Sequence, residues 1–211
     1  NCLSFYDTLS LDADKINLVR LHGALGDKPG RDAVCLKKLK NKNIDYLALG
    51  HIHSYQEGSI DDRGSYAYPG CLQGRGFDEI GEKGFILLTI EDKKIKKEFV
   101  PFSRVVIQAQ EVDISDRSSI PAIISKVKDS VSFVPNDIYR IVLKGDVPED
   151  ADFKEEDIKS GLEGLARFIN IKNLTRIKFD QDKLEKDFSL KGEFYRLVSS
   201  DSTLSEEEKQ E

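Results

Sequence analysis

The chain has 211 residues, of which 39% are hydrophobic and 33% are charged, as is ordinary for a globular protein of one large or two smaller domains. No apolar run reaches membrane-spanning length, and the first residues show no basic-then-apolar signal, so we expect a cytoplasmic protein without a membrane partner. The net charge is −6, of which the last eleven residues contribute −4. Because the rest of the chain is nearly neutral, charge alone indicates no nucleic-acid surface.

The first 104 residues show the pattern of an α/β unit. Apolar strands are expected at 16–21 and 46–49, and a helix at 32–42, capped by Asp32, is expected between them. Strand, helix and strand in this order predict a βαβ unit whose two strands are parallel. Residues 66–70 form a further short strand in this prediction, and 84–90 with 95–102 form a hairpin.

The residues after 104 show a different pattern of expected elements. Short strands are expected at 105–112, 138–144 and 168–177, and helices at 118–131 and 153–165. This pattern predicts a smaller α+β unit. A charged linker at 180–186 and a short helix at 190–198 follow. We therefore divide the chain into 1–104, 105–200 and an acidic tail at 201–211, where Ser205 and Glu208 form a capping box for a further helix. The missing initial Met indicates that the chain begins inside a longer protein.

The candidate functional residues are the three histidines of the chain. His51 and His53 follow the strand at 46–49 as Gly-His-x-His, and His22 follows the strand at 16–21. Residues at i and i+2 of an extended backbone point to the same side, and the carboxyl ends of parallel strands meet at one edge of a sheet. Each His taken alone could be a hydrogen-bonded loop or core residue, but the shared pattern favours a metal site.

These residues carry a resemblance to a known family. His22-Gly, the Gly50-His-x-His motif, Tyr68-Pro-Gly, the stretch from Gly74 to Glu79 (Gly-Arg-Gly-Phe-Asp-Glu) and Lys83-Gly-Phe resemble the second half of a calcineurin-like metallophosphoesterase. Within that superfamily, the stretch from Tyr68 to Phe85 and the appended α+β unit resemble the SbcD/YhaO-type DNA repair exonucleases. The resemblance covers most of the chain.

The resemblance implies a fold, an activity and a set of partners. The fold would be part of a two-sheet α/β sandwich, followed by an α+β capping domain that binds DNA. The site would hold two divalent metal ions, usually manganese, with His22 and His51 on one metal and His53 on the other. The implied partners are DNA and a coiled-coil ATPase of the SbcC type, and a homodimer is left open.

The resemblance also has a gap. The family's first three motifs, which supply the bridging Asp, an Asn ligand and the catalytic His, are absent from this chain and would lie upstream. Three neutral imidazoles do not satisfy two hard dications, which need anionic oxygen ligands. We therefore expect no catalytic residue within this chain and no activity from it alone.

Three functions compete at this point. The first is a metal-dependent DNA exonuclease or endonuclease subunit in DNA repair. The second is a phosphoesterase that acts on nucleotides or other small phosphoesters, and the third is a non-catalytic DNA-binding scaffold of the same fold. The retention of all three His ligands argues against the scaffold.

Overall fold

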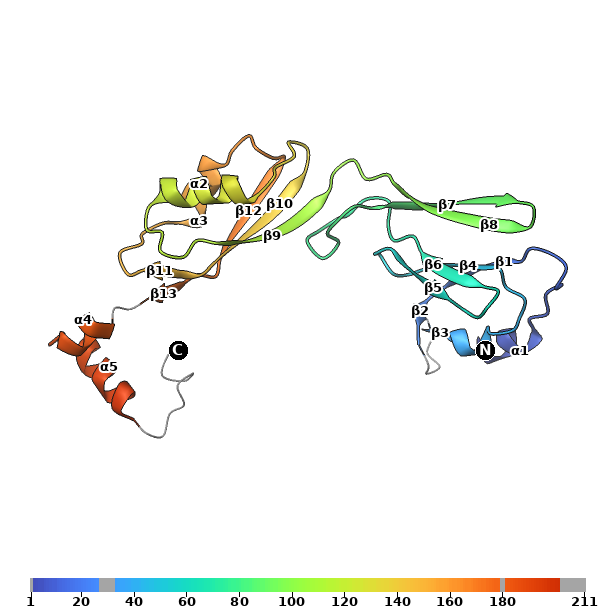
Figure 1. Ribbon diagram of the computed structural model, residues 1–211, viewed down its shortest axis with the longest axis horizontal. Helices are drawn as coiled ribbons and strands as arrows, with labels where there is room; N and C mark the ends of the chain where they lie inside the picture. Colours follow the sequence, from blue (N-terminus) through green and yellow to red (C-terminus); the bar gives the residue numbers. More distant parts are fainter. Residues whose placement is uncertain (1, 27–32, 179–180, 202–211) are drawn as a thin grey trace. The chain divides into compact units, whose positions relative to one another are not determined.

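A computed structural model describes residues 2–26, 33–178 and 181–201 of the chain (Figure 1). The chain divides into two compact units. Unit 1 comprises residues 1–109, 133–140 and 164–168, and unit 2 comprises 110–132, 141–163 and 169–211. The domain boundaries expected at residues 104 and 200 stay predictions.

Unit 1 is built on a four-stranded sheet with the order β1-β4-β6-β5. Its strands are β1 (Leu18–His22), β4 (Tyr46–Gly50), β6 (Ser65–Tyr68) and β5 (Gln56–Ser59). The first three strands are parallel, and β5 runs antiparallel to β6. The predicted strands at 16–21, 46–49 and 66–70 are confirmed, whereas β5 was not predicted because its sequence, Gln-Glu-Gly-Ser, is polar and mostly exposed.

The segment between β1 and β4 differs from the prediction. In place of the α-helix at 32–42, strand β3 (Ala33–Val34) pairs in parallel with β2 (Ala24–Leu25), and a single 3-10 turn, η1 (Leu36–Lys38), follows. The N–H of Cys35 donates to the Tyr6 hydroxyl, which keeps this backbone extended. Asn41 at φ 59° then ends the turn in the left-handed region. Asp32, the predicted cap, lies outside the described residues.

The core of unit 1 lies beneath this segment. Leu39 and Leu47 are fully buried, and Tyr6 of α1 (Cys2–Thr8), which was not predicted, joins them. The remaining buried members are Val34, Ile44, Leu49, Ile60 and Tyr68. The apolar positions at 34, 36 and 39 that suggested a helix therefore contact the core, but from a strand and a 3-10 turn.

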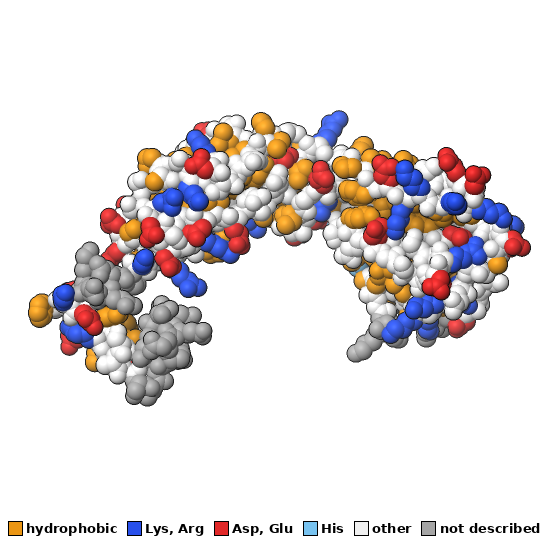
Figure 2. All heavy atoms as spheres, in the orientation of Figure 1, with side chains coloured by type: hydrophobic (Ala, Val, Ile, Leu, Met, Phe, Trp, Pro, Cys, Tyr) orange, Lys and Arg blue, Asp and Glu red, His pale blue; other side chains and the backbone are white. Residues whose placement is uncertain are grey.

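The hairpin predicted at 84–90 and 95–102 is confirmed. Strands β7 (Gly84–Glu91) and β8 (Lys94–Pro101) pair along their full length. Asp92 and Lys93 both have positive φ angles of 48° and 60°, as the tightest hairpin turn requires. Figure 2 shows hydrophobic side chains gathered over this hairpin, and its exposed apolar residues include Phe85, Leu87 and Ile90.

The second predicted set of elements is present in large part. Strands β9 (Ile107–Asp113), β10 (Ile138–Lys144) and β12 (Phe168–Asn173) form a sheet in the order β12-β10-β9 and contain residues of both units. Helices α2 (Ile120–Ser130) and α3 (Glu155–Gly161) cover one face of this sheet (Figure 1). Fully buried side chains between these elements include Ile123, Val127, Ile141, Leu143 and Ile158.

The end of the described chain departs from the prediction in two places. The strand expected at 168–177 is interrupted, because β13 (Arg176–Lys178) instead pairs with β11 (Asp146–Pro148). The residues expected to form a charged linker contain helix α4 (Gln181–Lys186), which contacts α5 (Leu190–Ser200). Leu184 is buried there, and Arg196 Nη1 donates to the carbonyls of Glu185 and Asp187, which stabilises the turn between the helices. The capping box of the acidic tail lies outside the described residues.

Candidate metal centre

Two of the predicted histidines meet at the carboxyl ends of neighbouring strands. His22 is the last residue of β1 and pairs in register with Gly50, the last residue of β4, and His51 follows directly. The rings of His22 and His51 lie 5.5 Å apart, centroid to centroid, at an interplanar angle of 86°. A Cβ at Gly50 would lie 2.8 Å from His22 Nδ1, so the imidazole reaches this position only because residue 50 is a glycine. The strand-end reasoning for this pair is thereby confirmed.

The backbone at His51 is different from the one assumed in the sequence analysis. Its φ angle is 108°, outside the range that side chains other than glycine ordinarily adopt. The argument that His51 and His53 share one side of an extended strand is therefore wrong. A non-glycine residue held in such a conformation is strained, and strain of this kind concentrates at functional sites.

His53 is held by a carboxylate from a distant loop. Its Nδ1 lies 2.7 Å from Oε1 of Glu79, a side chain that is only 6% exposed. Nη2 of Arg75 lies 2.7 Å from the same carboxylate oxygen, and the Arg75 N–H donates to Glu79 Oε2 at 2.9 Å. These contacts, Arg75 first and His53 second, lower the pKa of Glu79 from 4.5 to about 2.

This network determines which nitrogen of His53 is available. Because the Glu79 carboxylate stays ionised and can only accept hydrogen bonds, we assign the ring proton to Nδ1. Nη2 of Arg75 also lies 3.0 Å from Nδ1, but a protonated nitrogen cannot accept, so this guanidinium serves the carboxylate. In the neutral ring, the lone pair is then on the opposite nitrogen, Nε2. A carboxylate behind an imidazole is the usual support for a metal-binding histidine.

The loop that supplies this support was part of the recognised sequence pattern, but its two side chains were not identified as site residues. Residues 71–79 fold tightly, with the Glu79 N–H donating to the Gly76 carbonyl at 2.9 Å. Gly74 has no room for a side chain, because a Cβ would lie 2.7 Å from the Glu79 carbonyl oxygen. The Gly-Arg-Gly-Phe-Asp-Glu motif was the signal that could have identified Arg75 and Glu79.

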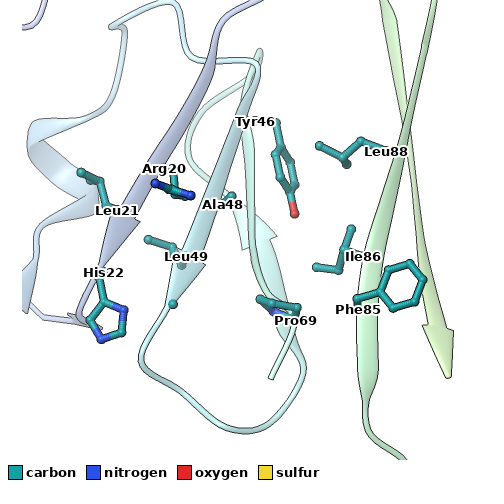
Figure 3. A pocket seen from close by; sticks show the side chains of 11 residues that line it. Arg20, Leu21, His22, Tyr46, Ala48, Leu49, Pro69, Phe85, Ile86 and Leu88 are labelled. Carbon is teal, nitrogen blue, oxygen red and sulfur yellow. The ribbon is translucent and has the colours of Figure 1, made fainter. Parts of the chain in front are cut away.

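A pocket of about 660 Å³ lies beside His22 in unit 1 (Figure 3). Strands β1 and β4 form one wall, and side chains of β7 face them across the pocket. Leu21, Leu49, Ile86 and Leu88 make its lining largely apolar, and Arg20 is its one cationic side chain. This lining suits apolar contact better than the binding of a phosphate group.

The donor set is incomplete for a two-metal centre. Within residues 2–26, 33–178 and 181–201, no group of three or more His, Cys, Asp or Glu side chains is arranged to hold a metal ion. The residues present fit the nitrogen share of such a centre, namely His22 with His51 and, separately, His53. Among the described residues, the anionic oxygen ligands that hard divalent ions require are not grouped with these imidazoles, and the Glu79 carboxylate is on the Nδ1 side of His53.

The described helices were compared with the length and hydrophobicity that a membrane-spanning helix needs. None of them is both long enough and apolar enough to cross a membrane.

Comparison with known proteins gives a distant relative. No family model matches the chain. Along 136 residues the chain is 32% identical to the uncharacterized metallophosphoesterase YhaO of Bacillus subtilis (strain 168), an alignment that covers 61% of this chain and 33% of the relative. The chain therefore matches about a third of the length of that protein. We conclude that most of this chain is distantly homologous to part of a metallophosphoesterase.

Proposed function

We propose that the protein is a metal-dependent phosphodiesterase that cleaves DNA in DNA repair. The observation that carries this proposal is the pairing of His22 with His51 at the ends of two parallel strands, in a chain homologous to a metallophosphoesterase. Imidazoles at the carboxyl ends of parallel strands are placed where α/β proteins build their sites. In this proposal the sheet of unit 1 is part of a two-sheet sandwich, and residues 105–200 form a cap that binds DNA.

Each histidine has a role in this proposal. His22 and His51 bind one divalent metal ion, and His53 binds a second through Nε2. The ions, with manganese the expected metal, supply an activated hydroxide and neutralise charge on the phosphate when they are bound. Glu79 and Arg75 orient the His53 ring and keep its proton on Nδ1. The carboxylate that bridges the metals and the catalytic His would come from another part of the intact protein.

Hydrolysis assays with the intact protein test this proposal. We expect manganese-dependent cleavage of bis-p-nitrophenyl phosphate and of linear duplex DNA, both abolished by a chelator. His51→Ala should lower both rates by orders of magnitude, because it removes a metal ligand. Ser54→Ala, a change at an exposed neighbour, is the matched control and should leave both rates unchanged.

Two other results would contradict parts of the proposal. Cleavage of bis-p-nitrophenyl phosphate without cleavage of DNA would indicate a phosphoesterase for small substrates. No metal-dependent hydrolysis of either substrate would indicate a scaffold that has the fold without the chemistry.

We further propose that helix α5 docks a coiled-coil ATPase of the SbcC type. Its apolar residues Leu190, Phe194 and Leu197 recur at helical spacing and are between 64% and 84% exposed. Orange side chains over α5 are visible in Figure 2. An exposed apolar helix face of this kind suits insertion into a groove or packing against another helix.

Co-purification of the intact protein with the ATPase tests this surface. Phe194→Glu should abolish the complex, because it places a charge in the apolar contact. Ser199→Glu introduces the same charge at an exposed polar position of α5 and should leave the complex intact. Equal recovery of the ATPase with both variants would refute docking through α5.

A further inference from the structure

Unit 1 contains a second pocket, of about 680 Å³, with a lining unlike that of the first. Two arginines, two residues with side-chain amides and two apolar residues line it. These residues are Arg104, Arg167, Gln73, Asn136, Val105 and Ile138.

The backbone that carries Arg104 is fixed by side-chain amides from two other segments. Gln73 Oε1 accepts from the N–H of Arg104 at 3.1 Å, and Gln73 Nε2 donates to the Val105 carbonyl at 2.7 Å. Asn136 Nδ2 donates to the Arg104 carbonyl at 2.6 Å. The arginine therefore projects from an anchored main chain, which lowers the entropy lost when it binds a ligand.

Arg167 is anchored in a similar way. Its N–H donates to the Asp137 carbonyl at 3.0 Å, and its Nη1 lies 3.5 Å from Asn136 Oδ1. The carboxylate of Asp137 is buried and accepts from the Val106 N–H and from Gln108 Nε2. The described lining of the pocket thus contains two arginines whose backbone is held by hydrogen bonds, and it contains no acid.

These two arginines differ from Arg63 and Arg75 in their charged partners. Arg63 and Arg75 each bind a carboxylate, at 3.0 Å and 2.7 Å. In the described part of the chain, neither Arg104 nor Arg167 has a carboxylate within ion-pair distance, and both are exposed. Two planar guanidinium groups facing one pocket match the geometry and charge of a phosphate group.

One loop links this pocket to the candidate metal centre. Gly74 lines the pocket, and its neighbour Arg75 binds Glu79, which in turn holds His53. A substrate with a single phosphate group could use only one of these two places. A nucleic-acid strand carries phosphates at regular spacing, so two of its phosphates can be bound at once.

We propose that Arg104 and Arg167 bind a phosphate group of a nucleic-acid strand while another phosphate of the same strand lies at the histidines. This inference rests on the proposed phosphodiesterase function and deepens it, because it names the residues that would hold the strand away from the histidines. Contacts of this kind position a strand without reading its sequence.

The test is a binding measurement in chelator, where no hydrolysis occurs. Fluorescence anisotropy of a short labelled single-stranded oligonucleotide would be followed with the 211-residue chain across a salt series. The double variant Arg104→Ala/Arg167→Ala should bind at least about tenfold more weakly. The slope of log affinity against log salt should fall by about 0.7, because the contact with one phosphate of a single strand is lost.

The matched control is Arg176→Ala, which removes one exposed arginine from β13 in unit 2. It should leave the affinity close to that of the unmodified chain. Circular dichroism and melting of every variant establish that folding is retained. A second arm adds inorganic phosphate and follows the Arg104 and Arg167 side-chain Nε–H signals by NMR.

Each outcome decides a separate point. If the double variant binds the oligonucleotide as well as the control does, the pocket assignment is wrong, whatever the intact protein does to bis-p-nitrophenyl phosphate. If inorganic phosphate shifts the two arginine signals but the oligonucleotide does not bind, the assignment to a strand is wrong. Weaker binding by the double variant, with no hydrolysis by the intact protein, supports the pocket and contradicts the enzyme.

Discussion

Replacing Arg75 by Ala should raise the pKa of Glu79. In the folded chain the carboxyl has a pKa of about 2 instead of 4.5, and the Arg75 side chain is the largest cause. An arginine beside a carboxylate lowers its pKa by about 1–3 units, so we expect a rise of at least about one unit in the Arg75→Ala variant. The hydrogen bonds from His53 and from the backbone of residue 75 would remain and keep the pKa below 4.5.

The same shift determines how Glu79 affects stability. A group whose pKa is lowered by folding stabilises the fold above its unfolded pKa, here 4.5, and loses this contribution as the pH falls toward its folded value, here about 2. In the Arg75→Ala variant the stabilisation should be smaller, and its loss should be complete at a higher pH than in the unmodified chain.

The assay is an NMR titration of the glutamate side-chain carboxyl carbons, with Glu79 assigned by substitution to Gln. Arg63→Ala is the control, since Arg63 pairs with Asp45 and not with Glu79. A Glu79 that titrates near 4.5 in the unmodified chain, or one whose pKa is the same in both arginine variants, would refute the network described here. The assignment of the His53 proton to Nδ1 would then lose its basis.

Three further predictions concern stability and activity. Tyr68→Phe should lower the free energy of unfolding by about 1–2 kcal/mol, because the buried hydroxyl donates to the Gly23 carbonyl at 2.7 Å. The control Tyr66→Phe should change the free energy of unfolding by less than about 0.5 kcal/mol. Urea denaturation measures both variants. His53→Ala should reduce manganese-dependent hydrolysis by the intact protein by orders of magnitude while melting in chelator stays nearly unchanged, and a large fall in the melting temperature would instead indicate a mainly structural role. The 211-residue chain should hydrolyse neither bis-p-nitrophenyl phosphate nor DNA, and activity in a preparation free of contaminating nucleases would overturn the assignment of its ligands.

The sequence predicts the strand ends of unit 1 well because apolar runs and glycine breaks are local signals. The proximity of His22 and His51 could be predicted from the sequence, because neighbouring parallel strands align their carboxyl ends. The helix at 32–42 was wrong because its apolar spacing also fits a strand followed by a 3-10 turn. The hydrogen bond from the Cys35 N–H to the Tyr6 hydroxyl favours the extended backbone over the helix. The two residues are 29 positions apart, so no local sequence pattern indicates this contact.

Long-range contacts also explain what was missed at the candidate sites. Glu79 reaches His53 across 26 residues through a loop, so nothing in the spacing of either residue indicates the partner. The arginine pocket assembles Arg104 and Arg167 from segments far apart in the chain, and no motif connects them. The hydrogen-bond partners of the polar groups in such loops are determined only in the folded molecule.

The position of β1 at one end of the sheet order has a geometric consequence. The strand at the opposite end, β5, is short and mostly polar, while β1 has the apolar sequence Leu-Val-Arg-Leu-His and Leu18 is 52% exposed. Among the described strands β1 has a neighbour on one side only, and a sheet edge of this composition is a template for one more strand. A strand that joined β1 in parallel would finish beside His22, so a carboxylate at its end would lie next to this imidazole.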